Sequence, residues 1–313
     1  MNRHLRKIFF YCLGRFFYLV GLYDKATFYY SKAIRFRFFF IDIQDRYKKS
    51  ITRGSANKSF LLKGGIGDIL QHLPFMLENK SLRYIVVTHF SEAKYFLENL
   101  GIKNYELHFF KSASEASLII KNLQKSNFCF HCPRDIFFEK NPFQNIKSLS
   151  NISSSPSIGL HVSASKVGLD KILPEILVNN ILDEVATLEY KLMIFCTKYE
   201  QKKMFSRNMK RKNIEFVNDD DIIKNLSRVC ECDFFIGSDS VFKTMSSMLR
   251  KPTLVVLPIR KINTFRDRMF LNPYIESGII SVYTLDGLGS DHIRAAMTFI
   301  FGKLHDAVKK GRI

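Results

Sequence analysis

Short apolar runs alternate with longer stretches in which apolar residues recur three and four positions apart, through most of the 313 residues. The short runs predict buried strands and the longer stretches predict amphipathic helices. The first series places strands over 59–63, 84–88, 105–109 and 127–131, with helices over 68–79, 91–100 and 114–124 between them. Strands that alternate with helices favour a parallel sheet covered by helices on both faces.

A second series of the same kind follows a stretch rich in serine at 151–157, which contains Pro156. Its strands are expected over 157–162, 191–196, 215–217, 233–237 and 253–257, and its helices over 174–188, 198–212, 221–228 and 240–249. The pattern predicts an α/β protein with two Rossmann-like, doubly wound domains, 56–152 and 157–289, and a closing helix within 290–313. Two such domains joined by a short linker would enclose a cleft, the usual place for a ligand.

Residues 1–55 differ from the rest and contain twelve Lys or Arg against three Asp. Two helical patterns meet at 21–24, and small residues at Gly14, Ala26 and Ala33 would let the helices approach closely. This spacing resembles a single tetratricopeptide-type helical hairpin, with Phe38 where the closing proline is usual. Because one repeat cannot bury its own face, we expect the block to dock on the body of the protein or on another chain.

The segment 34–40 interleaves basic and aromatic residues. The pattern fits an element that lies on a membrane surface. A helix that packs on the protein and leaves its arginines in solvent fits the pattern better.

The formal net charge of +19 favours anionic partners, among them nucleotide-sugars, anionic glycans or glycolipids, a membrane surface and nucleic acid. The basic residues are dispersed and no nucleic-acid-binding module is recognised, which argues against nucleic acid. The sequence contains no run of eighteen uncharged apolar residues, so we expect no transmembrane helix. No small-residue cleavage site follows the apolar N-terminal stretch, which argues against a secretory signal.

Six cysteines show no disulfide framework, which indicates a reducing cytoplasm. Cys129 and Cys132 flank His131 with the spacing of metal ligands, and Cys230 and Cys232 form a tighter pair. Both pairs lie in strand-like apolar runs, where a free cysteine usually packs as a small hydrophobe. We therefore expect neither a metal site nor a cofactor.

The stretch 60–74 ends a predicted strand in three glycines, Gly64, Gly65 and Gly67, followed by Asp68 and a helical segment. Glycine lets the backbone turn sharply and approach a ligand closely. A carboxylate here is poorly placed to bind phosphate but well placed to take a proton from a hydroxyl. The alternative is that Asp68 only caps the helix. The stretch matches neither G-x-G-x-x-G nor the P-loop.

Three segments in this order resemble glycosyltransferase family 9, the bacterial heptosyltransferases. They are 67–74 (GDILQHLP), 158–165 (IGLHVSAS) followed by 171–174 (KILP), and 232–240 (CDFFIGSDS) continuing through 245–253 (MSSMLRKPT).

The resemblance implies a GT-B fold and metal-independent transfer of a sugar with inversion, heptose from ADP-heptose in the first instance, to a cell-surface glycan or lipopolysaccharide-core acceptor. It implies a cytoplasmic enzyme and leaves an oligomer open. The basic and aromatic residues of 1–55, rather than the resemblance, make peripheral contact with the inner face of the bacterial inner membrane an open alternative. The implied site consists of the catalytic residues Asp68 as general base and Lys171 near the diphosphate, the donor-binding residues Ser163, Ser165, Glu200, Asp239 and Ser240, and the acceptor-side glycines Gly64, Gly65 and Gly67.

Each implied role has a structural alternative. Asp239 or Ser240 would also serve as a helix cap, Glu200 as a solvated first-turn acid, and His161 as a packed side chain. The donor motif departs from the family, because Val241 stands where a glycine is usual and Thr244 where a histidine is usual. A second interpretation is therefore a non-catalytic GT-B-fold protein for binding or assembly that docks through its N-terminal hairpin.

Overall fold

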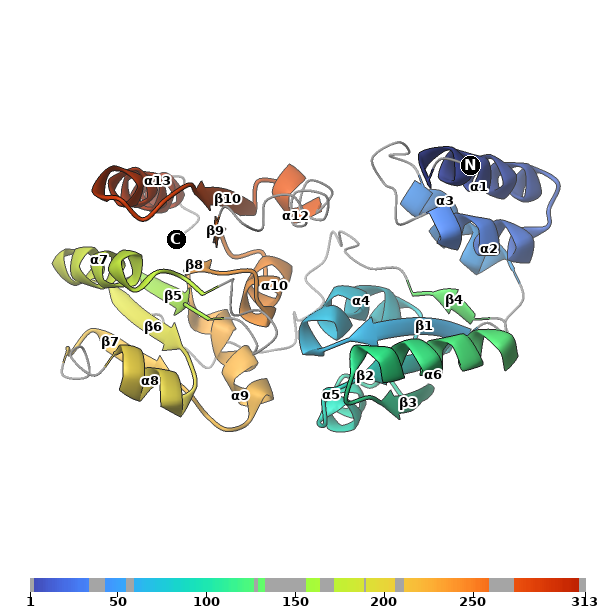
Figure 1. Cartoon of the computed structure of the whole chain (residues 1–313), viewed down its shortest axis with the longest axis horizontal. Helices are drawn as coiled ribbons and strands as arrows, with labels where there is room; N and C mark the ends of the chain where they lie inside the picture. Colours follow the sequence, from blue (N-terminus) through green and yellow to red (C-terminus); the bar gives the residue numbers. More distant parts are fainter. Residues whose placement is uncertain are drawn as a thin grey trace. The chain divides into compact units, whose positions relative to one another are not determined.

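The computed structural model describes residues 3–33, 43–54, 59–126, 129–132, 156–163, 172–188, 190–205, 211–258 and 273–309. The chain divides into two compact units, Met1–Ile136 and Phe137–Ile313. Each unit contains one sheet, and every strand pair within both sheets is parallel (Figure 1). The predicted α/β class is therefore confirmed for each unit. The division at 151–157 stays a prediction, since residues 151–155 lie outside the described residues.

Unit 1 builds its sheet in the order β3-β2-β1-β4. Its elements are α1 (Arg3–Leu19), α2 (Tyr23–Ala33), α3 (Ile43–Arg53), β1 (Ser59–Gly64), α4 (Ile66–Glu78), β2 (Arg83–Thr88), α5 (Ala93–Asn99), β3 (Tyr105–Phe109), α6 (Ala113–Ser126) and β4 (Cys129–His131). The strand order reverses between β1 and β4, so their carboxyl ends form the topological switch point of this sheet.

The N-terminal helices α1, α2 and α3 belong to unit 1. Gly14 of α1 lies so close to Tyr30 of α2 that a Cβ there would be 2.6 Å from the tyrosine ring. Thr27 of α2 donates a hydrogen bond to Ser50 of α3 at 3.0 Å, and α2 also contacts β4. The predicted close approach of two helices is observed, and the block docks on the sheet of its own unit. The resemblance to a tetratricopeptide repeat stays a prediction.

Unit 2 has the strand order β10-β9-β8-β5-β6-β7. Its elements are β5 (Ser157–His161), α7 (Glu175–Thr187), β6 (Lys191–Phe195), α8 (Lys198–Met204), β7 (Ile214–Val217), α9 (Ile222–Ser227), the 3-10 turn η4 (Arg228–Glu231), β8 (Phe234–Gly237), α10 (Val241–Met248), β9 (Thr253–Pro258), α12 (Pro273–Glu276), β10 (Ile280–Leu285) and α13 (Ser290–Lys309). Numbered from β5, this is the 3-2-1-4-5-6 order of a dinucleotide-binding fold, with its switch point between β5 and β8.

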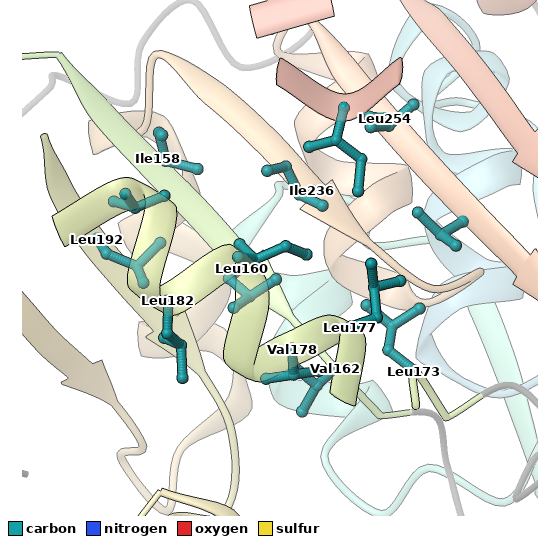
Figure 2. Close-up of a cluster of buried hydrophobic side chains, with 14 of the residues drawn as sticks. Ile158, Leu160, Val162, Leu173, Leu177, Val178, Leu182, Leu192, Ile236 and Leu254 are labelled. Atoms are coloured by element: carbon teal, nitrogen blue, oxygen red, sulfur yellow. The ribbon is translucent and has the colours of Figure 1, made fainter. Parts of the chain in front are cut away.

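The core of unit 2 forms where α7 packs on the sheet. Figure 2 shows side chains of β5, β6, β8 and β9 directed toward those of α7 and the segment before it. Ile293, Ile300 and Leu304 of α13 complete the cluster, so the predicted closing helix covers this unit. Continuous burial along β5 and β8 explains why these strands read as unbroken apolar runs.

Strand β10 and helix α3 are among the elements that were not predicted from the sequence. In the described part of the chain β10 pairs with β9 alone, and four of its six residues are partly exposed. This exposure weakens the apolar alternation on which the prediction relied. Helix α3 follows a segment rich in aromatic residues and consists mostly of polar and charged residues. No helix in the described ranges is long and apolar enough to span a membrane.

Candidate functional site

The glycine turn of unit 1 lies at the switch point of its sheet. Gly64 ends β1 with φ +141°, Gly65 precedes α4, and Gly67 is the second residue of that helix. A Cβ on Gly64 would lie 2.1 Å from Asp68 Oδ2, so side chain and backbone are nearly in contact here. Only glycine adopts such a backbone at little cost. The turn therefore requires glycine at position 64, beside the predicted acid.

Asp68 is half-buried in the first turn of α4. Its Oδ2 accepts a hydrogen bond from the Gly65 backbone N–H at 3.1 Å. The carboxylate thus caps the helix on which it lies, as the structural alternative predicted. An ionised carboxylate offers about four acceptor sites, so this bond does not preclude a second role.

Two further polar side chains lie near this turn, and the sequence analysis missed both. His89 follows β2 directly, and its Cε1 is 3.0 Å from where a Cβ on Gly65 would lie. Its ring packs against Phe110, 5.4 Å between centroids. Gln71, one turn after Asp68, has a buried Oε1 with no hydrogen-bond partner among the described residues. The position of His89 at the carboxyl end of a predicted strand was the available signal. We call Gly64, Gly65, Asp68 and His89 the unit 1 edge.

Ser163 and Ser238 join the two strands of the switch point in unit 2. Ser163 follows β5 and Ser238 follows β8, and both are buried. The Ser238 hydroxyl donates a hydrogen bond to the Ser163 carbonyl at 2.8 Å. This bond fixes the ends of β5 and β8 against each other where predicted donor-binding residues follow both strands.

Glu200 lies in the first turn of α8, directly after β6. One carboxylate oxygen accepts from the Thr197 backbone N–H at 2.7 Å, and the Thr197 hydroxyl accepts from the Glu200 backbone N–H at 3.2 Å. Burial acts to raise the pKa of Glu200, but hydrogen bonds from Ser163 and Thr197 outweigh it and hold the pKa below its ordinary value. Glu200 is therefore a helix-capping carboxylate that also contacts the β5 end.

His161, the last residue of β5, is buried against the Phe242 ring at a centroid distance of 4.6 Å. Burial lowers the pKa of His161 to about 4, although nearby Glu200 opposes the shift. Its Nδ1 is buried without a hydrogen-bond partner among the described residues. A buried polar atom of this kind is uncommon and marks a place where water or a ligand would complete the bonding.

Asp239 and Lys243 form an ion pair at the start of α10. The Lys243 Nζ lies 3.1 Å from Asp239 Oδ1, and the lysine side chain is almost fully buried. Ser240 caps α10 through its hydroxyl, which accepts from the Lys243 backbone N–H at 3.4 Å. Thr244 donates its hydroxyl to the Ser240 carbonyl at 3.3 Å. The ammonium group of Lys243 therefore turns back along the helix to Asp239.

The structure thus brings Ser163, Glu200, Asp239 and Ser240 to the carboxyl ends of neighbouring strands in one sheet. With His161, Ser238 and Lys243 we call them the unit 2 edge. Lys171 and Ser165 lie outside the described residues.

Metal ligands are not assembled in the part of the chain that the structure describes, where no group of three His, Cys, Asp or Glu could hold an ion. Cys132 and Cys232 are buried, and burial raises the pKa of both thiols. A thiol with a raised pKa is a poor metal ligand, because the thiolate is the binding form.

No protein-family model and no curated protein matches the chain. Among solved structures it is similar to the E. coli ADP-heptose LPS heptosyltransferase II, at 11% identity and TM-score 0.47 over 72% of this chain and 90% of that one. It is similar to a glycosyl transferase family 9 protein from Veillonella parvula DSM 2008, at 12% identity and TM-score 0.47 over 74% of this chain and 87% of that one.

A third similar structure is a UDP-GlcNAc 2-epimerase from Methanocaldococcus jannaschii, at 11% identity and TM-score 0.44 over 77% of this chain and 91% of that one. These solved proteins include both transferases and an epimerase. At these identities and TM-scores, none of the similarities bears on the activity of this chain.

Proposed function

We propose that the protein is a glycosyltransferase with a GT-B fold that transfers a sugar from a nucleotide-sugar to a glycan or glycolipid acceptor, with inversion and without a metal ion. ADP-heptose is the donor expected first, and a lipopolysaccharide core the acceptor expected first. Both follow from the resemblance of three sequence segments to glycosyltransferase family 9.

The observation that carries the proposal is the clustering of polar groups at the unit 2 edge. Ser163, Glu200 and Asp239 follow three different strands, and two of these strands, β5 and β8, form the switch point. In parallel α/β sheets this is where nucleotides bind. The buried Nδ1 of His161, which has no hydrogen-bond partner among the described residues, lies at the same edge and supports a ligand there.

On the acceptor side we assign Asp68 as the general base. The acceptor hydroxyl oxygen forms a bond to the anomeric carbon of the donor, and its proton passes to the Asp68 carboxylate. The bond between the anomeric carbon and the phosphate oxygen breaks, and the nucleoside diphosphate leaves with the electron pair. A base placed opposite the leaving group accounts for inversion.

On the donor side we assign Ser163, Ser165 and Lys171 to the diphosphate, Glu200 to the nucleoside ribose, and Asp239 and Ser240 to the start of α10. A cation near the diphosphate offsets the negative charge that develops on the leaving group, work that needs no metal ion. The Thr197 amide already orients Glu200 through a bond of 2.7 Å, so its carboxylate requires little ordering on binding.

The test is a transfer assay with the full chain, ADP-heptose and a lipopolysaccharide core that lacks heptose. We expect acceptor-dependent release of ADP. Asp68→Asn should lower kcat about 10²- to 10⁴-fold, the usual contribution of a general base. Asparagine keeps a side-chain oxygen that can accept from Gly65, so the melting temperature should stay nearly constant.

Glu175→Gln is the matched control, because Glu175 is an exposed acid in the first turn of α7. It should leave kcat unchanged. Full activity of Asp68→Asn would overturn the assignment of the base. Failure of every nucleotide-sugar tested, UDP-GlcNAc included, to bind or react would overturn the enzyme itself.

A second candidate is a binding or assembly protein of the same fold without catalysis. It is favoured by the start of α10, where Lys243 is paired with Asp239 and Thr244 is bonded to Ser240. These internal partners occupy polar groups that a donor would otherwise use. Val241 also carries a side chain where the family usually has a glycine, which leaves less room for the diphosphate of a donor. Calorimetry separates the two candidates, since the second predicts no heat with ADP, ADP-heptose or UDP-GlcNAc.

A further inference from the structure

Helix α1 has two apolar faces, and only one of them is buried. Tyr11 and Gly14 pack toward α2, with Phe10 and Phe17 partly covered beside them. Exposed large apolar side chains occupy the other side of α1 and the turn that follows it: Ile8, Phe9, Phe16, Leu19, Val20 and Leu22. The most exposed are Phe16 at 57% and Leu19 at 76%.

The exposed side chains of α1 form one continuous stripe. At about 100° per residue, Arg15, Ile8, Leu19, Cys12, Phe16 and Phe9 follow one another around about 120° of the helix. The buried Gly14 lies on the opposite side, and the buried Tyr11 lies beyond the edge that Arg15 forms. We call this stripe, with Val20 and Leu22, the α1 face. A contiguous apolar surface of this kind marks an interaction site, unlike single exposed apolar residues.

Basic groups lie along one edge of the α1 face, where Arg15 is exposed. Arg53 of α3 lies over the rings of Tyr18 and Tyr23, at 5.4 and 5.9 Å. In sequence, residues 1–33 contain six Lys or Arg and one acid, Asp24. An apolar stripe with aromatic residues and a basic border is the pattern of a helix that lies in a membrane interface.

We propose that the α1 face binds the surface of an anionic lipid bilayer, with α1 lying in the plane of the headgroups. Phe9, Phe16 and Leu19 enter the acyl boundary, while Arg15 extends to lipid phosphates. The charge of the chain favours this occupant over a second copy. Two copies of a chain with a net charge of +19 repel each other, whereas an anionic lipid surface attracts each copy. The proposal does not depend on the proposed enzymatic activity.

The absence of tryptophan from the sequence allows a direct test with the full chain. Phe16→Trp places a single indole on the α1 face, and Tyr95→Trp places one at a site of equal exposure, 57%, on α5. With vesicles of phosphatidylglycerol and phosphatidylcholine, the emission of Phe16→Trp should shift to the blue and resist quenching by acrylamide. Tyr95→Trp should show neither change, and vesicles of phosphatidylcholine alone should give a much smaller shift.

Vesicle co-sedimentation measures the strength of binding. Phe16→Ser with Leu19→Ser should lower the partition coefficient at least tenfold, whereas Leu118→Ser with Tyr95→Ser, at 60% and 57% exposure, should leave it unchanged. Arg15→Gln should lower it about fivefold, the value that corresponds to about 1 kcal/mol per basic residue.

Three results would overturn the proposal. They are no binding of the wild type to anionic vesicles, equal loss in the α1 and control pairs, and a dimer in sedimentation that Phe16→Ser with Leu19→Ser dissociates. The last would assign the α1 face to a second copy.

Discussion

The two edges that carry the predicted site residues are built differently. At the unit 1 edge the acid is held within its own turn, where Asp68 accepts from the Gly65 backbone N–H. At the unit 2 edge, groups that follow different strands bond to one another, Ser238 to Ser163 and Ser163 to Glu200, and the ion pair of Lys243 with Asp239 lies beside them at the start of α10. The first edge has a half-buried carboxylate and an exposed histidine, and the second has a buried lysine paired with a partly exposed acid.

This difference suggests that the two edges respond differently to substitution. A group held by local contacts can be changed with little effect on the fold, so its loss should be visible mainly in activity. Groups that join several strands contribute to stability as well, because removal of one leaves a buried partner unsatisfied. The predictions below test this contrast, beginning with the largest expected effect on the free energy of unfolding.

The first prediction concerns His161, which should make the stability of the protein depend on pH. Its folded-state pKa of about 4 lies below the ordinary value of 6.5. As the pH falls, the histidine of the unfolded chain therefore takes up a proton before that of the folded chain, which favours unfolding. The free energy of unfolding should be highest above pH 6.5 and should fall as the pH drops from 6.5 to 4. The difference corresponds to about 3 kcal/mol.

Denaturant unfolding at several pH values checks this prediction. Between pH 6.5 and 4, the free energy of unfolding of His161→Leu should depend less steeply on pH than that of the wild type. The difference in slope should correspond to at most one proton taken up on unfolding. His305→Leu, on the exposed side of α13, is the control. Equal slopes in the wild type and His161→Leu would show that the unit 2 edge does not bury its histidine.

The second prediction concerns the ion pair at the start of α10. Asp239→Ala should lower the free energy of unfolding by about 2 kcal/mol, because it leaves the buried Lys243 ammonium without its partner. Lys243→Met in the same chain should recover most of the loss, since the unpaired charge is then absent. A double-mutant cycle by urea unfolding measures the coupling, and additive losses would contradict a paired, buried lysine.

The third prediction concerns Gly64 at the unit 1 edge. Gly64→Ala forces a side chain onto a backbone with φ +141° and into the space of Asp68 Oδ2. Gly278→Ala is the matched control, with φ +70° and no atom within 4 Å of the added Cβ. Gly64→Ala should destabilise the protein by about 1 kcal/mol more than the control. In thermal unfolding, its melting temperature should lie clearly below that of Gly278→Ala. Equal losses would mean that the turn adapts.

Much of the fold could be predicted because buried parallel strands leave a strong signal. β5 and β8 are buried along their whole length and appear in the sequence as apolar runs bounded by polar loops. β10 was missed because it is a half-exposed edge strand with Ser281 and Thr284 in its apolar run. The long closing helix α13 was predicted, since Ile293, Ile300 and Leu304 repeat with the helical period.

The candidate site was predicted in part, for a related reason. Residues that follow predicted strands, such as Ser163, Glu200 and Asp239, could be expected near one sheet edge once the strands were assigned. His89 also follows a predicted strand, but it was overlooked because its proximity to Gly65 depends on the pairing of β1 with β2. The ion pair of Lys243 with Asp239 depends on the conformation of the lysine side chain.

The sequence by itself determined that the chain forms two parallel α/β units, which residues follow the strands, and that a glycine-rich turn precedes Asp68. The spacing of apolar residues and the positions of glycines are local properties that can be read directly from the sequence. Only the tertiary structure decided that His161 is buried with a nitrogen that has no partner among the described residues, and which face of α1 remains exposed. Those features depend on which elements pack together, and packing joins residues that lie far apart in the chain.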